Sequence, residues 1–162
     1  MGKITLVFLL SLVTCGSSNL KNPESNDKKI LAAYDYVSKR YNDKIIVSNT
    51  FADIDIVNFA EQIAKKQNKE MSIVLDSLIK GKDRYEIKQY PVKELLKNPD
   101  NKGNLKLFFS DPKEDYIMVE AFKVEKNLDY EELTLFGSSD VYLLYFKDDQ
   151  ITDEYQIKLD YN

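Results

Sequence analysis

The chain contains one cysteine, Cys15, among its 162 residues. A disulfide within one chain requires a second thiol, so the fold must be held together by its hydrophobic core. Hydrophobic residues make up 43% of the sequence, and a chain of this length can bury enough of them to form one stable domain. The position of Cys15 is informative as well, because it closely follows an apolar segment.

The first fifteen residues have the organisation of a bacterial lipoprotein signal. Lys3 provides a short cationic start, residues 4–13 form an apolar segment, and Cys15 follows Thr14. A membrane-spanning helix needs about 20 apolar residues, so this segment is too short to cross a bilayer. We predict a signal peptide over residues 1–14 and a lipid anchor, such as one carrying palmitate, on the sulfur of Cys15. Thr14 is larger than the Gly, Ala or Ser that usually precedes such a cysteine.

Two other interpretations of this segment stay open. A plain secretory signal needs small residues three and one before the cleavage site, which Gly16 with Ser18, or Cys15 with Ser17, would provide. A short apolar run can also be part of a buried core. N-myristoylation is excluded because its motif requires Ser or Thr where this chain has Leu6.

The segment after Cys15 is polar and rich in turn-forming residues, with Leu20 as its only apolar side chain. We expect residues 15–27 to be a flexible tether and residues 28–162 to form a single α+β domain. The formal net charge of −4 argues against a nucleic-acid partner. We expect export and anchoring at the bacterial cell envelope, at the outer membrane, with the leaflet left open.

Helical spacing dominates the first half of the domain. Apolar residues recur at this spacing over residues 27–41, with Asp27 as the expected N-cap. Residues 45–47 are a short β-branched run that is consistent with a strand. Thr50, with Asp53 three residues later, predicts a capped helix of about four turns that extends to Ile63.

A further helix is predicted from Met71 to Leu78, with Gly81 as its C-terminal stop. We expect this helix and the one before it to pack as a hairpin. After Gly81, Tyr85 and Ile87 alternate with polar residues, and Pro91 opens a short predicted helix.

The second half of the chain has the pattern of strands. Residues 98–104 form a strong turn cluster, and the apolar runs beyond it cover residues 105–109, 116–124, 133–136, 141–146 and 151–161. Residues 141–146 are apolar on both faces and predict a central strand, whereas residues 155–161 alternate and predict one solvated face. The fold class we expect is α+β, with N-terminal helices packed on one face of a C-terminal antiparallel β-meander of four to five strands.

Three segments carry a resemblance to a known group of proteins: Phe109-Ser-Asp-Pro112, residues 116–122, and Gly137-Ser-Ser-Asp140 with the strand to Lys147. With the signal, they resemble small uncharacterised lipoproteins of Bacteroidota. In that group, a Phe-Ser-x-Pro segment precedes a strand, and a Gly-Ser turn leads into a strand and a hairpin that usually closes with tryptophan. This chain has no tryptophan. The resemblance implies export and a fold but no catalytic residue.

The absence of histidine limits the chemistry that this sequence can perform. Histidine-based triads and His-ligated zinc or iron sites are excluded. Acidic pairs remain as candidates for a carboxylate-based envelope hydrolase: Asp53/Asp55, Asp111/Glu114/Asp115, Asp148/Asp149 and Asp153/Glu154. Their positions in a predicted first helical turn and in predicted turns favour structural roles, so we assign no catalytic residue and no cofactor.

Two other short motifs also favour a structural interpretation. Residues 100–104 combine oxygen ligands with Gly103, but they lack the spacing and the distal glutamate of a calcium loop, so we assign no metal. Gly137-Ser-Ser-Asp140 lacks the second glycine of a nucleophile elbow.

The sequence is rich in tyrosine, with 11 Tyr and 8 Phe residues. Tyrosine suits surfaces that bind proteins or glycans. We expect most of these rings to fill a β core or to line its rim, and the candidates for this role are Tyr142, Tyr145, Tyr155 and Tyr161. We expect a lipid-anchored, non-catalytic binding or interaction module that uses its sheet face or helical hairpin to bind an envelope protein or a glycan. The alternatives are a secreted binding protein or inhibitor and the carboxylate hydrolase.

Overall fold

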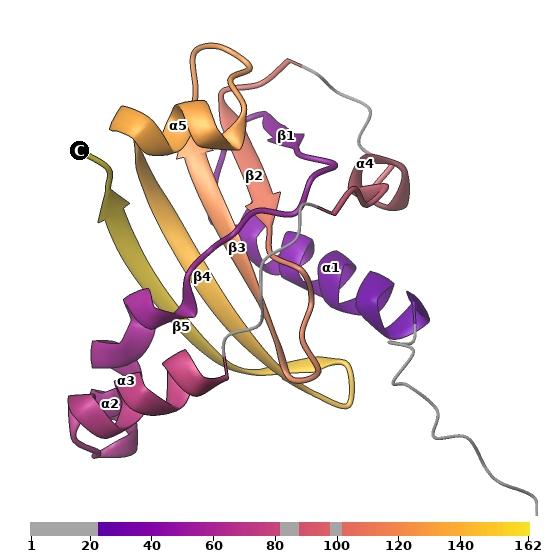
Figure 1. The fold of residues 1–162 in the computed structure, drawn as a ribbon. Coiled ribbons are helices and arrows are strands. Elements are labelled where there is room, and N and C mark those ends of the chain that lie inside the picture. The colour runs from indigo at the N-terminus through magenta and orange to yellow at the C-terminus, as the bar shows by residue number, and fades with distance from the viewer. Residues whose placement is uncertain (1–22, 82–87, 98–101) are drawn as a thin grey trace, which may run out of the picture.

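A five-stranded sheet lies at the centre of the fold, with helices packed on both of its faces (Figure 1). The computed structural model describes residues 23–81, 88–97 and 102–162. Helices dominate the N-terminal part of the described chain and strands the C-terminal part. The α+β class predicted from the sequence is therefore confirmed.

The strands follow one another across the sheet in chain order, from β1 to β5. Their bounds are Ile45–Val47 for β1, Leu105–Phe109 for β2, Tyr116–Lys123 for β3, Ser138–Lys147 for β4 and Gln150–Asp160 for β5. β2 to β5 form the predicted antiparallel meander, whereas β1 lies parallel to β2 and makes the sheet mixed.

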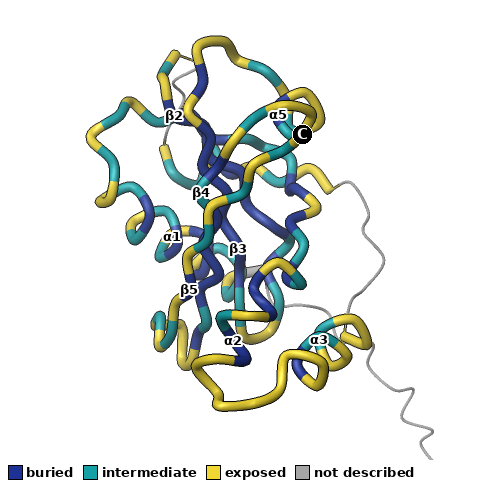
Figure 2. The backbone as a smooth tube through the Cα atoms, turned by 90° about the vertical axis from the view of Figure 1, so that its left-hand side faces the viewer, coloured by how far each residue is buried: buried dark blue, intermediate teal, exposed yellow. Residues whose placement is uncertain are grey.

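Both faces of the sheet carry a hydrophobic core. In β3, Ile117, Val119 and Ala121 belong to one core cluster, whereas Met118 and Phe122 belong to the other. The expectation that helices cover only one face was wrong, because adjacent side chains of the central strands point to opposite sides and are buried on both. Figure 2 shows this burial in β2, β3 and β4.

β4 is buried on both faces along most of its length, as its apolar sequence predicted. β5 is an edge strand in which intermediate and exposed residues alternate, with Tyr155 buried. Its sequence pattern predicted this single solvated face. The hairpin between the two strands turns at Asp148 and Asp149, both of which have positive φ angles.

Helix α1 (Pro23–Ser38) covers one face of the sheet through Ile30, Ala33 and Val37. It begins and ends earlier than predicted, so residues 23–27 of the expected tether are helical and Asp27 lies inside the helix instead of capping it. The Asp27 carboxylate accepts a hydrogen bond from the Tyr90 hydroxyl. This contact links α1 to a segment more than sixty residues away, so the local sequence could not reveal it.

The predicted helix from Thr50 to Ile63 is partly wrong. Residues 51–55 have no regular secondary structure and contain the buried side chains of Phe51, Ala52 and Ile54. The 3-10 helix η1 (Ile56–Phe59) follows, with Asp55 as its N-cap, and leads into α2 (Ala60–Gln67).

The other helices of this region agree with the sequence. Helix α3 (Met71–Lys80) ends at Gly81 and packs against α2, which confirms the predicted hairpin. Pro91 precedes α4 (Val92–Leu95), the short helix that was predicted there. The predicted alternation at Tyr85 and Ile87 lies outside the described residues.

The apolar run at residues 133–136 is helical, although the sequence analysis placed it among the strands. Helix α5 (Tyr130–Phe136) begins with a capping box, in which Asp129 accepts from the Glu132 amide and Glu132 accepts from the Asp129 amide. These reciprocal bonds satisfy two backbone donors at the helix start. The spacing of Asp129 and Glu132 in the sequence was therefore the signal for this helix.

Candidate functional site

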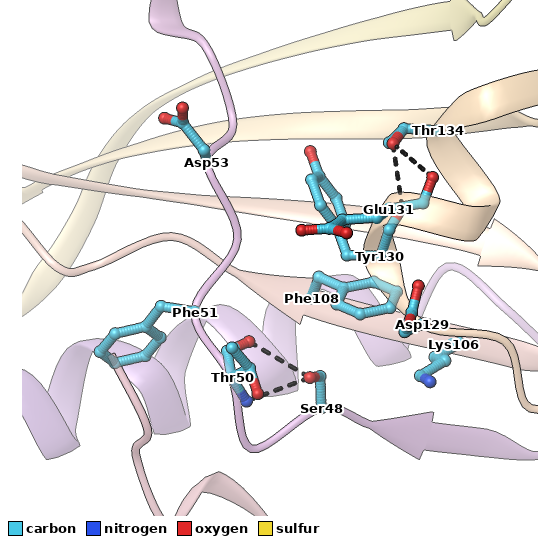
Figure 3. A pocket seen from close by; sticks show the side chains of 10 residues that line it. All are labelled: Ser48, Thr50, Phe51, Asp53, Lys106, Phe108, Asp129, Tyr130, Glu131 and Thr134. Carbon is cyan, nitrogen blue, oxygen red and sulfur yellow. Dashed lines mark hydrogen bonds between the residues drawn. The ribbon is translucent and has the colours of Figure 1, made fainter. Parts of the chain in front are cut away.

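A cavity of about 570 Å³ lies between the segment that follows β1, strand β2 and helix α5 (Figure 3). Four lining residues come from the segment after β1: Ser48, Thr50, Phe51 and Asp53. The others come from β2, Lys106 and Phe108, and from the start of α5, Asp129, Tyr130, Glu131 and Thr134. Residues far apart in the sequence thus form one concave site, as is usual for small-molecule pockets.

Backbone hydrogen bonds explain why the segment after β1 forms a wall of this cavity. The Ser48 amide donates to the Leu107 carbonyl at 3.0 Å, and the Ala52 amide donates to the Phe109 carbonyl at 2.8 Å. The segment therefore continues alongside β2 after the regular strand ends. The helix predicted from Thr50 onwards would have lost the bond from Ala52 to β2.

Aromatic rings form the apolar part of the site. Phe108 and Tyr130 meet edge to face with ring centroids 5.1 Å apart, and Phe122 lies next to both rings. Phe108 is buried, whereas Tyr130 is only partly covered. Such rings offer an apolar surface to the flat face of a ligand.

Behind Tyr130 lies Glu120, a glutamate that is completely buried. Its carboxylate accepts hydrogen bonds from the hydroxyls of Tyr130 at 2.7 Å, Ser139 at 2.5 Å and Tyr161 at 2.5 Å. Burial, followed by the nearby Glu120 charge, raises the pKa of Tyr130 above its usual range. Glu120 therefore fixes the position of a cavity wall through three neutral donors.

Lys106 is the cation of the site, and its side chain is only 8% exposed. The ammonium group donates to Asn127 Oδ1 at 2.8 Å and to the Leu128 carbonyl at 2.5 Å, and it lies 5.1 Å from the centroid of the Phe108 ring. Burial lowers the pKa of Lys106, and Lys93 adds to this effect, while Asp129 and Glu132 oppose it. No carboxylate of the described residues forms an ion pair with this ammonium.

The other polar groups of the cavity are mainly hydrogen-bond acceptors. Asp53 and Glu131 are exposed carboxylates on two different walls. The Thr134 hydroxyl donates to the carbonyls of Tyr130 and Glu131, as Figure 3 shows, so its lone pairs stay available. The site can therefore bind hydrogen-bond donors on one side and an anion near Lys106.

Most of the acidic candidates from the sequence occupy structural positions elsewhere. Asp53 lines the cavity, but Asp55 caps η1. The remaining candidates lie in the loop between β2 and β3 or near the hairpin of β4 and β5, where Asp111 pairs with Lys88 at 2.7 Å, Asp153 with Lys66 and Glu154 with Arg40 at 3.3 Å. The structure thus does not bring the members of any predicted pair together in the cavity.

The serine motif at the start of β4 has a structural role. Gly137 is the C-cap of α5, and the buried Ser139 hydroxyl donates to Glu120. Asp140 accepts a hydrogen bond from the Tyr41 hydroxyl at 2.9 Å. The motif therefore fastens β4 to its neighbours, in agreement with the structural interpretation of the sequence.

Cys15 lies outside the described residues, as do Asp100 and Asn101 of the candidate calcium loop. Within the described ranges, no group of three or more carboxylate or cysteine side chains could hold a metal ion. None of the helices in these ranges has the length and apolar character of a membrane span. Gly103, at the end of the calcium candidate, packs closely against the Lys44 carbonyl.

The functional residues predicted from the sequence do not include Lys106, Glu120 or Tyr130. Lys106 and Glu120 lie in β2 and β3, on the same sheet face as Phe108 and Phe122. In both strands the alternation of side chains assigns these charged residues to a buried face of the sheet. A charge at such a position indicates a candidate functional residue. No protein-family model, characterised protein or solved structure was found to match this chain.

Proposed function

We propose that this chain is a lipid-anchored protein of the bacterial cell envelope and that its folded domain is a non-catalytic binding module. The observation that supports binding is the cavity between residues 48–53 and α5, which combines aromatic rings, a buried ammonium and free acceptors. These are the features of a site that orients a small polar ligand. The support for anchoring is the sequence pattern that ends at Cys15.

The position of the cavity is compatible with anchoring. Residues 16–22 connect Cys15 to the start of α1 at Pro23, and seven residues can span at most about 25 Å. An anchored domain would therefore stay close to the bilayer on the side where α1 begins. The lining residue Phe108 belongs to the core cluster on the sheet face opposite α1, so a lipid on Cys15 would leave that side of the cavity accessible.

The anchor is tested by the intact mass of the mature protein extracted with detergent from the membrane fraction. We expect a chain that begins at Cys15 and carries the added mass of acyl groups, and we expect Cys15→Ala to lose both the acyl mass and the membrane association. Ser17→Ala is the matched control and should be processed normally. A soluble chain that begins after Ser17 or Ser18 would contradict anchoring and would favour the secreted binding protein.

A carboxylate-based hydrolase is the second candidate, because Asp53 and Glu131 both line the cavity. Hydrolysis of a glycoside requires two such groups on opposite sides of the reacting bond. The test is turnover of chromogenic glycosides by the wild-type chain and by Glu131→Gln. Turnover that disappears in the variant would favour the hydrolase over the binding module.

A further inference from the structure

The described part of the chain contains two buried lysines, Lys29 and Lys106. Lys29 donates to two backbone carbonyls away from the cavity, whereas Lys106 lines it. Both hydrogen-bond acceptors of the Lys106 ammonium group, Asn127 Oδ1 and the Leu128 carbonyl, are neutral. An ammonium group has three N–H donors, so one remains after these two bonds. Buried charges in proteins are usually paired with an opposite charge, because removing an unpaired ion from water is costly.

The surroundings of Lys106 provide attraction at longer range but no direct ion pair. Asp129 and Glu132 both favour the charged form of Lys106, yet each is committed to the capping box of α5. Lys93 acts in the opposite direction. An anionic group of a ligand could therefore form the direct contact that the described residues do not provide.

The other walls of the cavity carry hydrogen-bond acceptors and therefore favour a ligand with hydrogen-bond donors. Glu131 and Asp53 are carboxylates that make no hydrogen bond or ion pair within the described residues, and Thr134 has free lone pairs. In the view of Figure 3 the rings of Phe108 and Tyr130 lie between Asp53 and Lys106, and Glu131 lies beside Tyr130. A matching ligand carries an anion at one end, an apolar face, and hydroxyl or ammonium donors at the other end.

We infer that the cavity binds a small molecule with a carboxylate that contacts Lys106 and with hydrogen-bond donors that face Glu131 and Asp53. This inference rests on the proposed binding function and specifies its ligand. Two kinds of molecule have this chemistry, short peptides with free ends and sugar acids. Each kind of molecule has a counterpart of nearly the same shape that lacks the carboxylate, an amide for the peptide and a neutral sugar for the sugar acid. Comparing the affinities of acid and counterpart therefore tests the carboxylate contact.

The test compares the binding of four probes to the wild-type mature chain. Binding is monitored by the NMR signals of the backbone amides at residues 48–53 and 129–134. The probes are alanyl-alanine, its C-terminal amide, glucuronate and glucose. We expect at least one carboxylate probe to shift these signals and to bind about tenfold more tightly than its counterpart without the carboxylate. The pair that shows this difference identifies the kind of ligand.

Lys106→Gln tests the residue itself. The variant should lose the preference for the carboxylate, so that acid and counterpart bind within about twofold of each other. Lys123→Gln, at an exposed lysine at the end of the neighbouring strand β3, is the matched control and should keep the preference. The unperturbed NMR signals of β3 and β4 would show that Lys106→Gln is folded.

Three results would overturn the inference: binding in which neither acid exceeds its own counterpart without the carboxylate, a preference that survives in Lys106→Gln, or no shift at the cavity with any probe. The first two results would leave the binding function standing, because a ligand still enters the cavity. The anchor is tested separately by the mass of the mature chain, so its failure cannot be confused with a failure at Lys106.

Discussion

A single buried carboxylate, Glu120, connects the sheet to helix α5 and to the chain after β5. It is fully buried and accepts three hydroxyl hydrogen bonds, from Tyr130, Ser139 and Tyr161. Hydrogen bonds to a charged acceptor are stronger than those between neutral groups. This residue therefore holds together segments that contact one another only in the folded state.

We predict that Glu120→Gln lowers the free energy of unfolding by about 1–3 kcal/mol, because an amide nitrogen replaces one acceptor and leaves a buried hydroxyl without its partner. The change is measured by urea unfolding. Glu125→Gln, at an exposed glutamate, is the control and should stay within about 0.5 kcal/mol of the wild type. Equal stability of the two variants would contradict the role assigned to Glu120.

Gly103 is required for a close backbone contact. A Cβ atom at this position would lie 2.3 Å from the Lys44 carbonyl oxygen, whereas a Cβ at Gly81 would have its nearest neighbour at 3.6 Å. We predict that Gly103→Ala lowers the unfolding free energy by about 1–3 kcal/mol and that Gly81→Ala does not. Thermal unfolding of the two variants checks this, and similar melting temperatures would argue against the contact.

At the scale of secondary structure, the capping box of α5 positions one wall of the cavity. We predict that Asp129→Ala destabilises the protein by about 1 kcal/mol, because the Glu132 amide loses its acceptor. Amide hydrogen exchange should then become faster in α5. Glu131→Gln, in the same helical turn but outside the capping box, should leave exchange unchanged, and equal exchange in both variants would contradict the prediction.

Elements were predictable from the sequence where local patterns determine them. The spacing from Met71 to Leu78 with Gly81 identified α3, and the apolar run at residues 141–146 identified β4. Residues 51–55 are not helical because the amides of Phe51 and Ala52 bond to distant carbonyls, those of Lys88 and of Phe109 in β2. The apolar run of helix α5 was predicted to be a strand because the prediction did not include the capping residues Asp129 and Glu132.

At the scale of the whole molecule, the sequence predicted the α+β class but neither the two-sided core nor the cavity. The cavity depends on three segments that meet only after the sheet has formed, so Lys106 and Tyr130 had no visible relationship in the sequence. The lipid anchor, by contrast, is predicted from the sequence alone, because it depends on a local pattern that ends at Cys15. Cys15 lies outside the described residues. The two-sided core and the cavity could not be predicted because they depend on contacts between residues far apart in the sequence.

The tyrosines give the whole molecule a predictable response to alkaline pH. Within the described residues, several tyrosines have a raised pKa, in each case with burial as the largest cause: Tyr41, Tyr90, Tyr130, Tyr142, Tyr145, Tyr155 and Tyr161. A raised pKa in the folded state means that folding favours the neutral phenol. The resulting stability is complete below the ordinary pKa of about 10 and is lost as the pH rises through the folded-state value.

We therefore predict that the free energy of unfolding falls as the pH rises from about 10 towards 12, the value to which burial raises the pKa of Tyr145. Urea unfolding across this range measures the fall, and the ultraviolet absorbance of tyrosinate should appear at lower pH in the unfolded chain than in the folded one. Tyr145→Phe removes one such phenol and should reduce the fall by on the order of 1 kcal/mol, given the partial exposure of this side chain. Parallel pH profiles for wild type and variant would show that Tyr145 does not contribute, because a phenol that ionises equally in both states leaves stability independent of pH.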